Sequence, residues 1–176
     1  ADEDIIRFDM AGTENFTMDG PRLEVLNSGH SVFIGEGAGA ADNLSTNNNV
    51  FVGFESGHAN TNGEYNTGTG HHTLTANITG SFSTAIGYGS LHTSTTGTYN
   101  TASGAYSLLE NTTGEHNTAF GSRSLYANTT GNFNTALGYE ADVLSGNLTN
   151  ATAIGYKARV GASNSLVLGG TGGDKV

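Results

Sequence analysis

The sequence contains no cysteine, no tryptophan and only one proline among its 176 residues. Without cysteine, a disulfide framework, cysteine-ligated zinc and thiol chemistry are excluded. Cations are scarce as well: six lysines and arginines stand against 16 acidic residues, and none occurs from Leu23 to Ser122. Nucleic-acid binding requires cations that neutralise phosphates, so we expect neither a nucleic-acid partner nor attraction to an anionic membrane surface.

Long hydrophobic runs are also missing. No stretch approaches the roughly 20 apolar residues that a membrane-spanning helix needs, so we expect no membrane insertion in this segment. The first residues lack the basic, apolar and small-residue pattern of a secretion signal. Both ends are expected to continue into a longer protein, with residues 170–176 forming a linker to a C-terminal region.

Glycine is abundant, at 27 residues, and it recurs at a fixed spacing. A motif of a polar residue, Thr, Ala, an apolar residue and Gly returns nine times, and its spacing is a constant seventeen positions from Gly53 to Gly155. The glycines of this motif, which are predicted to form coil turns, are Gly35, Gly53, Gly70, Gly87, Gly104, Gly121, Gly138, Gly155 and Gly169. A disordered chain would not keep this spacing, so the pattern predicts an ordered repeat architecture.

Two columns of residues appear when the repeats are aligned on that glycine. The apolar column contains Ile34, Val52, Ile86, Phe120, Leu137, Ile154 and Leu168, and the small-residue column contains Ala85, Ala102, Ala119 and Ala136. Alternation with period two places these columns on opposite faces of a strand. We predict that the apolar column, together with Thr, faces the interior of the coil, and that the alanine face receives a closely packed second chain.

A repeat of this length suits one coil of two short strands joined by two turns, stacked on the next coil at about 4.8 Å. The fold prediction is therefore an all-β, parallel β-roll (β-solenoid) of about nine coils over residues 30–169. Turn glycines are expected to supply positive φ or close approach, and Asn77, Asn111 and Asn128 to bond local backbone. Residues 1–29 alternate differently and are predicted to form a hairpin-rich cap on the first coil.

So thin a coil buries few side chains. Backbone ordering costs roughly 1–2 kcal/mol per residue, whereas each buried apolar side chain returns only about 1.5–3 kcal/mol. A monomer is therefore expected to be marginal, and a symmetric homo-oligomer is the usual solution.

The repeat units resemble those of known surface proteins. Units 117–121 and 134–138, with the variant 83–87, are similar to the head repeats of trimeric autotransporter adhesins of the YadA type, and the longer unit 124–131 resembles bacterial tail-fibre-domain surface proteins. The resemblance covers about residues 30–169. It implies a left-handed roll, a homotrimer, an extracellular position on the bacterial cell surface, no enzymatic activity, and attachment to a cell, matrix or glycan receptor. The coil of this chain departs from that family in being longer than the usual one.

Candidate chemistry is sparse. His58 and His92 share a column, five residues after the glycine, but its other members are not His, so solvated loop side chains are favoured over a metal ring. Three carboxylate pairs have the spacing to be considered for glycoside hydrolysis, and we interpret them as loop acids: Glu55 with Glu64, Glu110 with Glu115, and Glu140 with Asp142. Calcium at Asp42, Asn43 and 47–49 is the weaker interpretation of that oxygen-rich stretch, since it lacks a known loop spacing, and no cofactor is predicted.

Three alternatives to a cell-anchored adhesin stay open. The same roll can serve as the receptor-binding or spacer fibre of a phage tail or contractile injection particle. Ice binding is weaker, because we expect the Thr columns to lie partly inside the roll. A tailspike-type enzyme is the weakest, since no catalytic constellation can be identified.

Overall fold

The computed structural model describes residues 7–10, 13–19, 22–25 and 29–170. Its regular elements are all strands: β1 (Arg7–Met10), β2 (Thr13–Asp19), β3 (Arg22–Val25), β4 (Val32–Ile34), β5 (Val50–Val52), β6 (Thr67–Thr69), β7 (Thr84–Ile86), β8 (Thr101–Ser103), β9 (Thr118–Phe120), β10 (Thr135–Leu137), β11 (Asp142–Val143), β12 (Ala151–Ile154), β13 (Arg159–Val160) and β14 (Ser165–Leu168).

The first three strands form a sheet of their own. β1 pairs with β2 and β2 with β3, both antiparallel, in the order β1-β2-β3. The antiparallel pairing is the local structure expected of hairpins, while capping of the first coil stays a prediction. Residues 20–21, between β2 and β3, and most of the predicted 170–176 linker lie outside the described residues.

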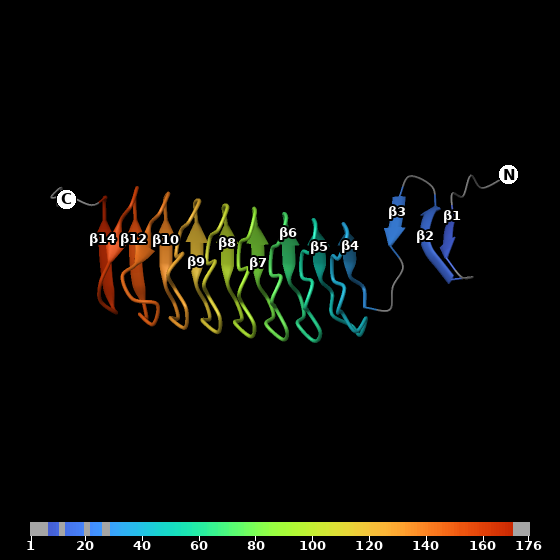
Figure 1. The fold of residues 1–176 in the computed structure, drawn as a ribbon, viewed down its shortest axis with the longest axis horizontal. Coiled ribbons are helices and arrows are strands. Elements are labelled where there is room, and N and C mark those ends of the chain that lie inside the picture. The colour runs from blue at the N-terminus through green and yellow to red at the C-terminus, as the bar shows by residue number, and fades with distance from the viewer. Residues whose placement is uncertain (1–6, 11–12, 20–21, 26–28, 171–176) are drawn as a thin grey trace.

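Residues 29–170 form a parallel β-solenoid of about eight turns. Nine strands lie side by side in the order β14-β12-β10-β9-β8-β7-β6-β5-β4, and every neighbouring pair is parallel. Each strand contributes one rung of a rod whose coils follow one another from β4 to β14 (Figure 1). The register repeats the spacing of the sequence motif, as in Thr84 opposite Thr101 and Ala85 opposite Ala102. The predicted parallel repeat fold is thus confirmed.

The second side of most coils is not the predicted second strand. Between Gly53 and Gly138 it is a series of turns in which two positions per coil take positive φ, for example His72 at 57° and Leu74 at 50°. Backbone hydrogen bonds still join successive coils there, as from the amide of Leu74 to the carbonyl of Ser90 at 3.2 Å. Within residues 29–170, only the last coils have a strand on this side, where β11 pairs in parallel with β13.

The predicted orientation of the two strand columns was wrong, because inside and outside are exchanged. The buried, central column of the strands, which lines the interior of the coil, contains Phe51, Ala85, Ala102, Ala119, Ala136 and Ala153. The outward apolar side chains of that sheet include Ile34, Ile86, Phe120, Leu137 and Leu168, which are 46–58% exposed. Val52 and Ile154 are half-buried on that same outward side.

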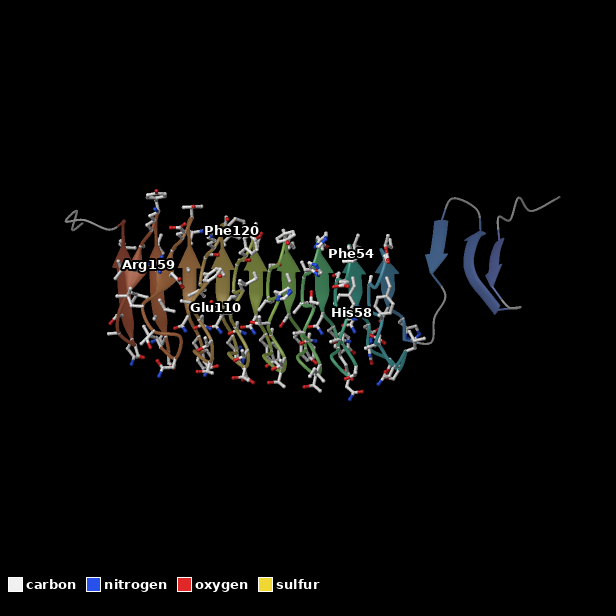
Figure 2. The ribbon with its side chains drawn as sticks, in the orientation of Figure 1. Phe54, His58, Glu110, Phe120 and Arg159 are labelled. Carbon is white, nitrogen blue, oxygen red and sulfur yellow. The ribbon has the colours of Figure 1, made fainter. Side chains whose placement is uncertain are left out.

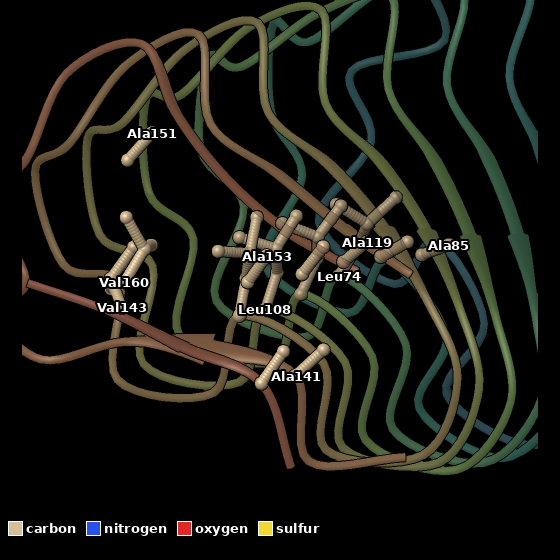
Figure 3. Close-up of a cluster of buried hydrophobic side chains, with 14 of the residues drawn as sticks. Leu74, Ala85, Leu108, Ala119, Ala141, Val143, Ala151, Ala153 and Val160 are labelled. Atoms are coloured by element: carbon tan, nitrogen blue, oxygen red, sulfur yellow. The ribbon is translucent and has the colours of Figure 1, made fainter. Parts of the chain in front are cut away.

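The interior is small because side chains from both sides of the coil must share it. In the first coils a large ring faces a glycine: a Cβ on Gly39 would lie 2.7 Å from the Phe33 ring, and Gly57 contacts the Phe51 ring in the same way. At β7, β8 and β9 the small side chain lies on the strand and the large one lies on the opposite side of the coil. Alanine occupies the strand and a fully buried leucine occupies the position six residues later: Leu91, Leu108 and Leu125. Leu74, Leu108, Ala85 and Ala119 all belong to the buried cluster shown in Figure 3.

Much of the remaining interior is polar and is hydrogen-bonded across coils. The side-chain amide of Asn100 donates to the carbonyl of Gly114 at 2.8 Å, and its side-chain oxygen accepts the amide of Asn117 at 3.0 Å. The predicted local bonds of three asparagines are confirmed, since Asn77, Asn111 and Asn128 each donate to the glycine carbonyl three residues later at 2.9–3.1 Å. These ladders satisfy buried polar groups that would otherwise be costly.

The predicted role of the turn glycines is also confirmed. At Gly121 φ is 127°, and a Cβ there would lie 2.6 Å from the carbonyl oxygen of Gly138 in the next coil. Only glycine combines that backbone conformation with so close a stacking distance.

Candidate binding surfaces

The outward side of the nine-stranded sheet, which we call the outer sheet face, carries no charged residue on its strands. They present Thr and the apolar column and contain no Asp, Glu, Lys or Arg. Thr67, Thr84, Thr101, Thr118, Thr135 and Thr152 follow one another in register, half-buried or exposed. Phe54 and Phe120 lie toward one edge of the ribbon in Figure 2. A long, uncharged and partly apolar face of this kind is typical of interaction surfaces.

An aromatic ladder borders that face on the side where the strands begin. Tyr65, Phe82, Tyr99, His116 and Phe133 stack in succession, with ring centroids 4.7–5.1 Å apart and interplanar angles of 4–10°. Phe82 and Tyr99 are 47% and 50% exposed, so the ring edges contact solvent along five coils. Stacked pairs contribute about 0.5–1.5 kcal/mol each beyond area burial.

Every residue of this ladder has a left-handed backbone, which bulky side chains disfavour. The same coil position is occupied at the two ends of the solenoid by His30, Asn48, Asn150 and Asn164, with φ of 52–57°. Asparagine tolerates that conformation better than an aromatic residue does. The five rings therefore offset local strain through stacking between coils, which the end positions do not use.

A pocket of about 420 Å³ opens where the leucine column ends. Leu125 is followed, at the same position after the turn glycine, by Asp142 and Arg159, which are in register on β11 and β13. The Arg159 guanidinium donates to Asp142 Oδ2 at 3.1 Å. The pocket is lined by Arg123, Tyr126, Ala127, Glu140, Asp142 and Arg159. Arg159 lies near the C-terminal end of the rod in Figure 2.

Burial dominates the electrostatics of Asp142. Loss of solvent raises the pKa of its carboxyl from 3.8 to about 6, opposed by the amides of Val143 and Ala127 and by Arg159. Glu140 differs, since a hydrogen bond from Tyr139 lowers its pKa. Its carboxylate lies 3.6 Å from Arg123 Nη1 and 3.5 Å from Lys157 Nζ. The contact with Arg123 is longer than a hydrogen bond.

The two histidines considered for metal binding are not brought together within the chain. His58 Nδ1 lies 3.2 Å from the carbonyl oxygen of Gly37. His92 instead packs against His72, with ring centroids 5.8 Å apart, and its pKa is lowered, first by burial and then by His72. His72 Nδ1 is 3.2 Å from Glu55. Among the residues described, no group of three or more His, Cys, Asp or Glu side chains could hold a metal ion.

The candidate carboxylate pairs have different surroundings. Glu55 is beside His72, whereas Glu64, Glu110 and Glu115 are exposed. Only Glu140 and Asp142 line a common pocket. Both oxygens of Asp142 already accept hydrogen bonds, from the amides of Val143 and Ala127 and from Arg159.

At the stretch considered for calcium, Asp42 is surrounded by N–H donors. The amide of Leu44 donates to it at 2.8 Å, and the side-chain amides of Asn47, Asn49 and Asn60 donate at 3.1–3.2 Å. This carboxylate therefore organises the loop through hydrogen bonds, and a cation would have to replace them.

Sequence reasoning missed the pocket, and it found the aromatic column without assigning it a binding surface. The ladder was visible as a column of Tyr, Phe and His, but its continuous stacking depends on coil geometry. The signal for the pocket was the replacement of leucine by Asp142 and Arg159 in the column that begins at Leu74.

Comparison of the chain with protein-family models, with curated proteins and with solved structures finds no significant match. In the described part of the chain, no helix is long and apolar enough to cross a membrane.

Proposed function

We propose that this chain is a self-assembling rod segment of an extracellular bacterial adhesin, a left-handed roll that works as a homotrimer. The observation that supports this proposal is the outer sheet face, which runs uncharged along nine strands with apolar side chains 46–58% exposed. Handedness and the number three follow from the resemblance to YadA-type heads.

A second copy of the chain suits this face for two reasons. The solenoid repeats every coil, at about 4.8 Å, and another rod of the same pitch matches its ridges along the whole length. The chain has a net charge of −10, and its acidic residues lie outside the strands of this sheet. Copies can therefore approach through this face without placing like charges opposite each other.

The size of the face agrees with an interface. Nine strands at about 4.8 Å give a length of about 40 Å, and three-residue strands with their flanking columns give a width of about 20 Å. The resulting area is close to the roughly 800 Å² that each partner contributes to a standard interface. The remaining loops and the edges of the aromatic ladder would carry adhesion to a cell, matrix or glycan receptor, with repeated copies providing avidity.

Light-scattering mass of the purified chain tests assembly. We expect three times the mass of a single chain, and a Phe120→Asp variant should dissociate because it places a charge in the uncharged face. Leu144→Asp is the matched control, since Leu144 is 66% exposed but lies in a loop. A monomeric wild-type chain would remove the assembly proposal, and absence of adhesion to cells, matrix and glycans would remove the adhesive part. A fibre of a phage-like particle would show the same assembly.

Ice binding becomes a second candidate because the predicted position of the Thr column was wrong. The in-register Thr column was expected partly inside the roll, but it lies on the outer sheet face. An outward ladder of hydroxyl and methyl groups can order water. The apolar column beside it is uneven, however, because its side chains differ in size, from that of Thr69 to that of Phe120. A thermal-hysteresis measurement decides this: no hysteresis at millimolar concentration would exclude it.

A further inference from the structure

The pocket at the end of the leucine column has a charge unlike that of the rest of the rod. Within residues 29–170 there are three cations, Arg123, Lys157 and Arg159, against eight acidic residues. All three are ion-paired with Glu140 or Asp142, and two of them, Arg123 and Arg159, line one pocket together with these carboxylates. Within residues 29–170, an anionic group could therefore contact a guanidinium only at this pocket.

Packing alone does not require ionic residues here. In four preceding coils leucine fills the equivalent position with 0–1% exposure: Leu74, Leu91, Leu108 and Leu125. Replacing a buried ion pair by apolar residues is often neutral or stabilising. The stability of the core therefore does not explain why Asp142 and Arg159 occupy these positions. A buried carboxyl with a strongly perturbed pKa in a cleft is a candidate for function.

The contacts show which groups are available to a ligand. Arg159 uses one guanidinium nitrogen for Asp142 and is 36% exposed. Arg123 is 53% exposed and lies beyond hydrogen-bond distance from Glu140. Tyr126 and Ala127 supply the apolar part of the lining. A volume of about 420 Å³ falls in the range of small-molecule sites.

We propose that this pocket binds one acidic sugar residue, with the sugar carboxylate between Arg123 and Arg159 and the ring against Tyr126. Guanidinium groups recognise carboxylates through paired, charge-assisted hydrogen bonds. Glu140, whose pKa is lowered, remains an acceptor for sugar hydroxyls, which a simple anion could not supply. Asp142 positions Arg159 and does not contact the sugar, because its two oxygens are already occupied. The site rests on the adhesive part of the proposed function, for which it names a ligand class, but it needs no second copy of the chain.

Titration calorimetry of the full chain with D-glucuronate and N-acetylneuraminate tests the proposal, with glucose and inorganic phosphate as comparison probes. We expect at least one of the two sugar acids to bind about tenfold more tightly than both comparison probes. Arg123→Ala and Tyr126→Ala should each weaken that binding about tenfold, whereas Tyr106→Ala, at the coil position of Arg123 one coil earlier, should not.

Lowering the pH from 7 to 5 provides a second readout. Asp142 faces Arg159 and, at longer range, Glu110, and it gains a proton in this interval because its pKa is about 6. Arg159 is then released toward the ligand, so affinity should rise roughly threefold. Equal binding of glucose or phosphate, or no effect of Arg123→Ala and Tyr126→Ala, would overturn the proposal. Light-scattering mass of the same samples reports separately on assembly.

Discussion

The regular coils between Gly53 and Gly138 and the last coils after Gly138 solve the same packing problem differently. In the regular coils the side opposite the strand is a turn series, and from Leu74 onward it carries a buried leucine at φ of 47–51°. In the last coils β11 and β13 form a short second sheet, and Val143 and Val160 fill the interior. Figure 3 shows these two valines next to each other, apart from the leucine and alanine stack.

The local sequence accounts for the difference. The coils that begin at Gly104 and Gly121 read Ser-Leu and continue into Asn-Thr-Thr-Gly, and the three regular coils before them vary this pattern with other small and polar residues, which favour turns. The last coils read Ala141-Asp142-Val143 and Ala158-Arg159-Val160, and such alternation with valine favours strands. Where leucine is replaced, a hydrogen bond from the Ala127 amide to the Asp142 carboxylate takes the place of a backbone bond to the next coil. In the last coils, the strands opposite the nine-stranded sheet therefore occur where the buried leucine is replaced by a buried carboxylate.

Moving that charge into the regular coils should have the largest effect. Leu91→Asp places an unpaired carboxylate in a position with 0% exposure and should lower the free energy of unfolding by about 3–5 kcal/mol, measured by urea denaturation. Adding Leu108→Arg, one coil later, copies the Asp142–Arg159 arrangement and should restore at least about 1 kcal/mol. If the double variant is no more stable than Leu91→Asp, the ion pair depends on the strands of the last coils.

The second prediction concerns pH. Because the folded-state pKa of Asp142, about 6, lies above its ordinary value of 3.8, the protonated form favours folding. The chain should therefore gain about 1.4 kcal/mol between pH 7 and pH 5, and this contribution is lost as the pH rises through 6. Asp142→Asn is the control. Its stability should lack this increment, and an identical pH profile in both proteins would show that Asp142 is not the group responsible.

The smallest effect is expected at the aromatic ladder. Tyr99→Asn introduces the residue that the end coils use at this position, which relieves backbone strain but removes two stacked contacts. We expect a net loss of about 1 kcal/mol in unfolding free energy. Asn150→Tyr, at the same position near the end of the ladder, is the matched comparison and should gain stability through stacking on Phe133. A gain from Tyr99→Asn would mean that the ladder is not retained for stability.

The sequence by itself determined the repeat length, the parallel register, the turn glycines and the asparagine bonds. Each of these depends on residues that recur at a fixed spacing, so every coil repeats the same local requirement. Only the tertiary structure decided which strand column faces inward, because a period-two pattern assigns two faces without saying which is buried. Alanine is inside because the buried leucine six residues later already fills the narrow coil. That leaves Ile86 and Phe120 outside, on the face through which we propose the chain assembles.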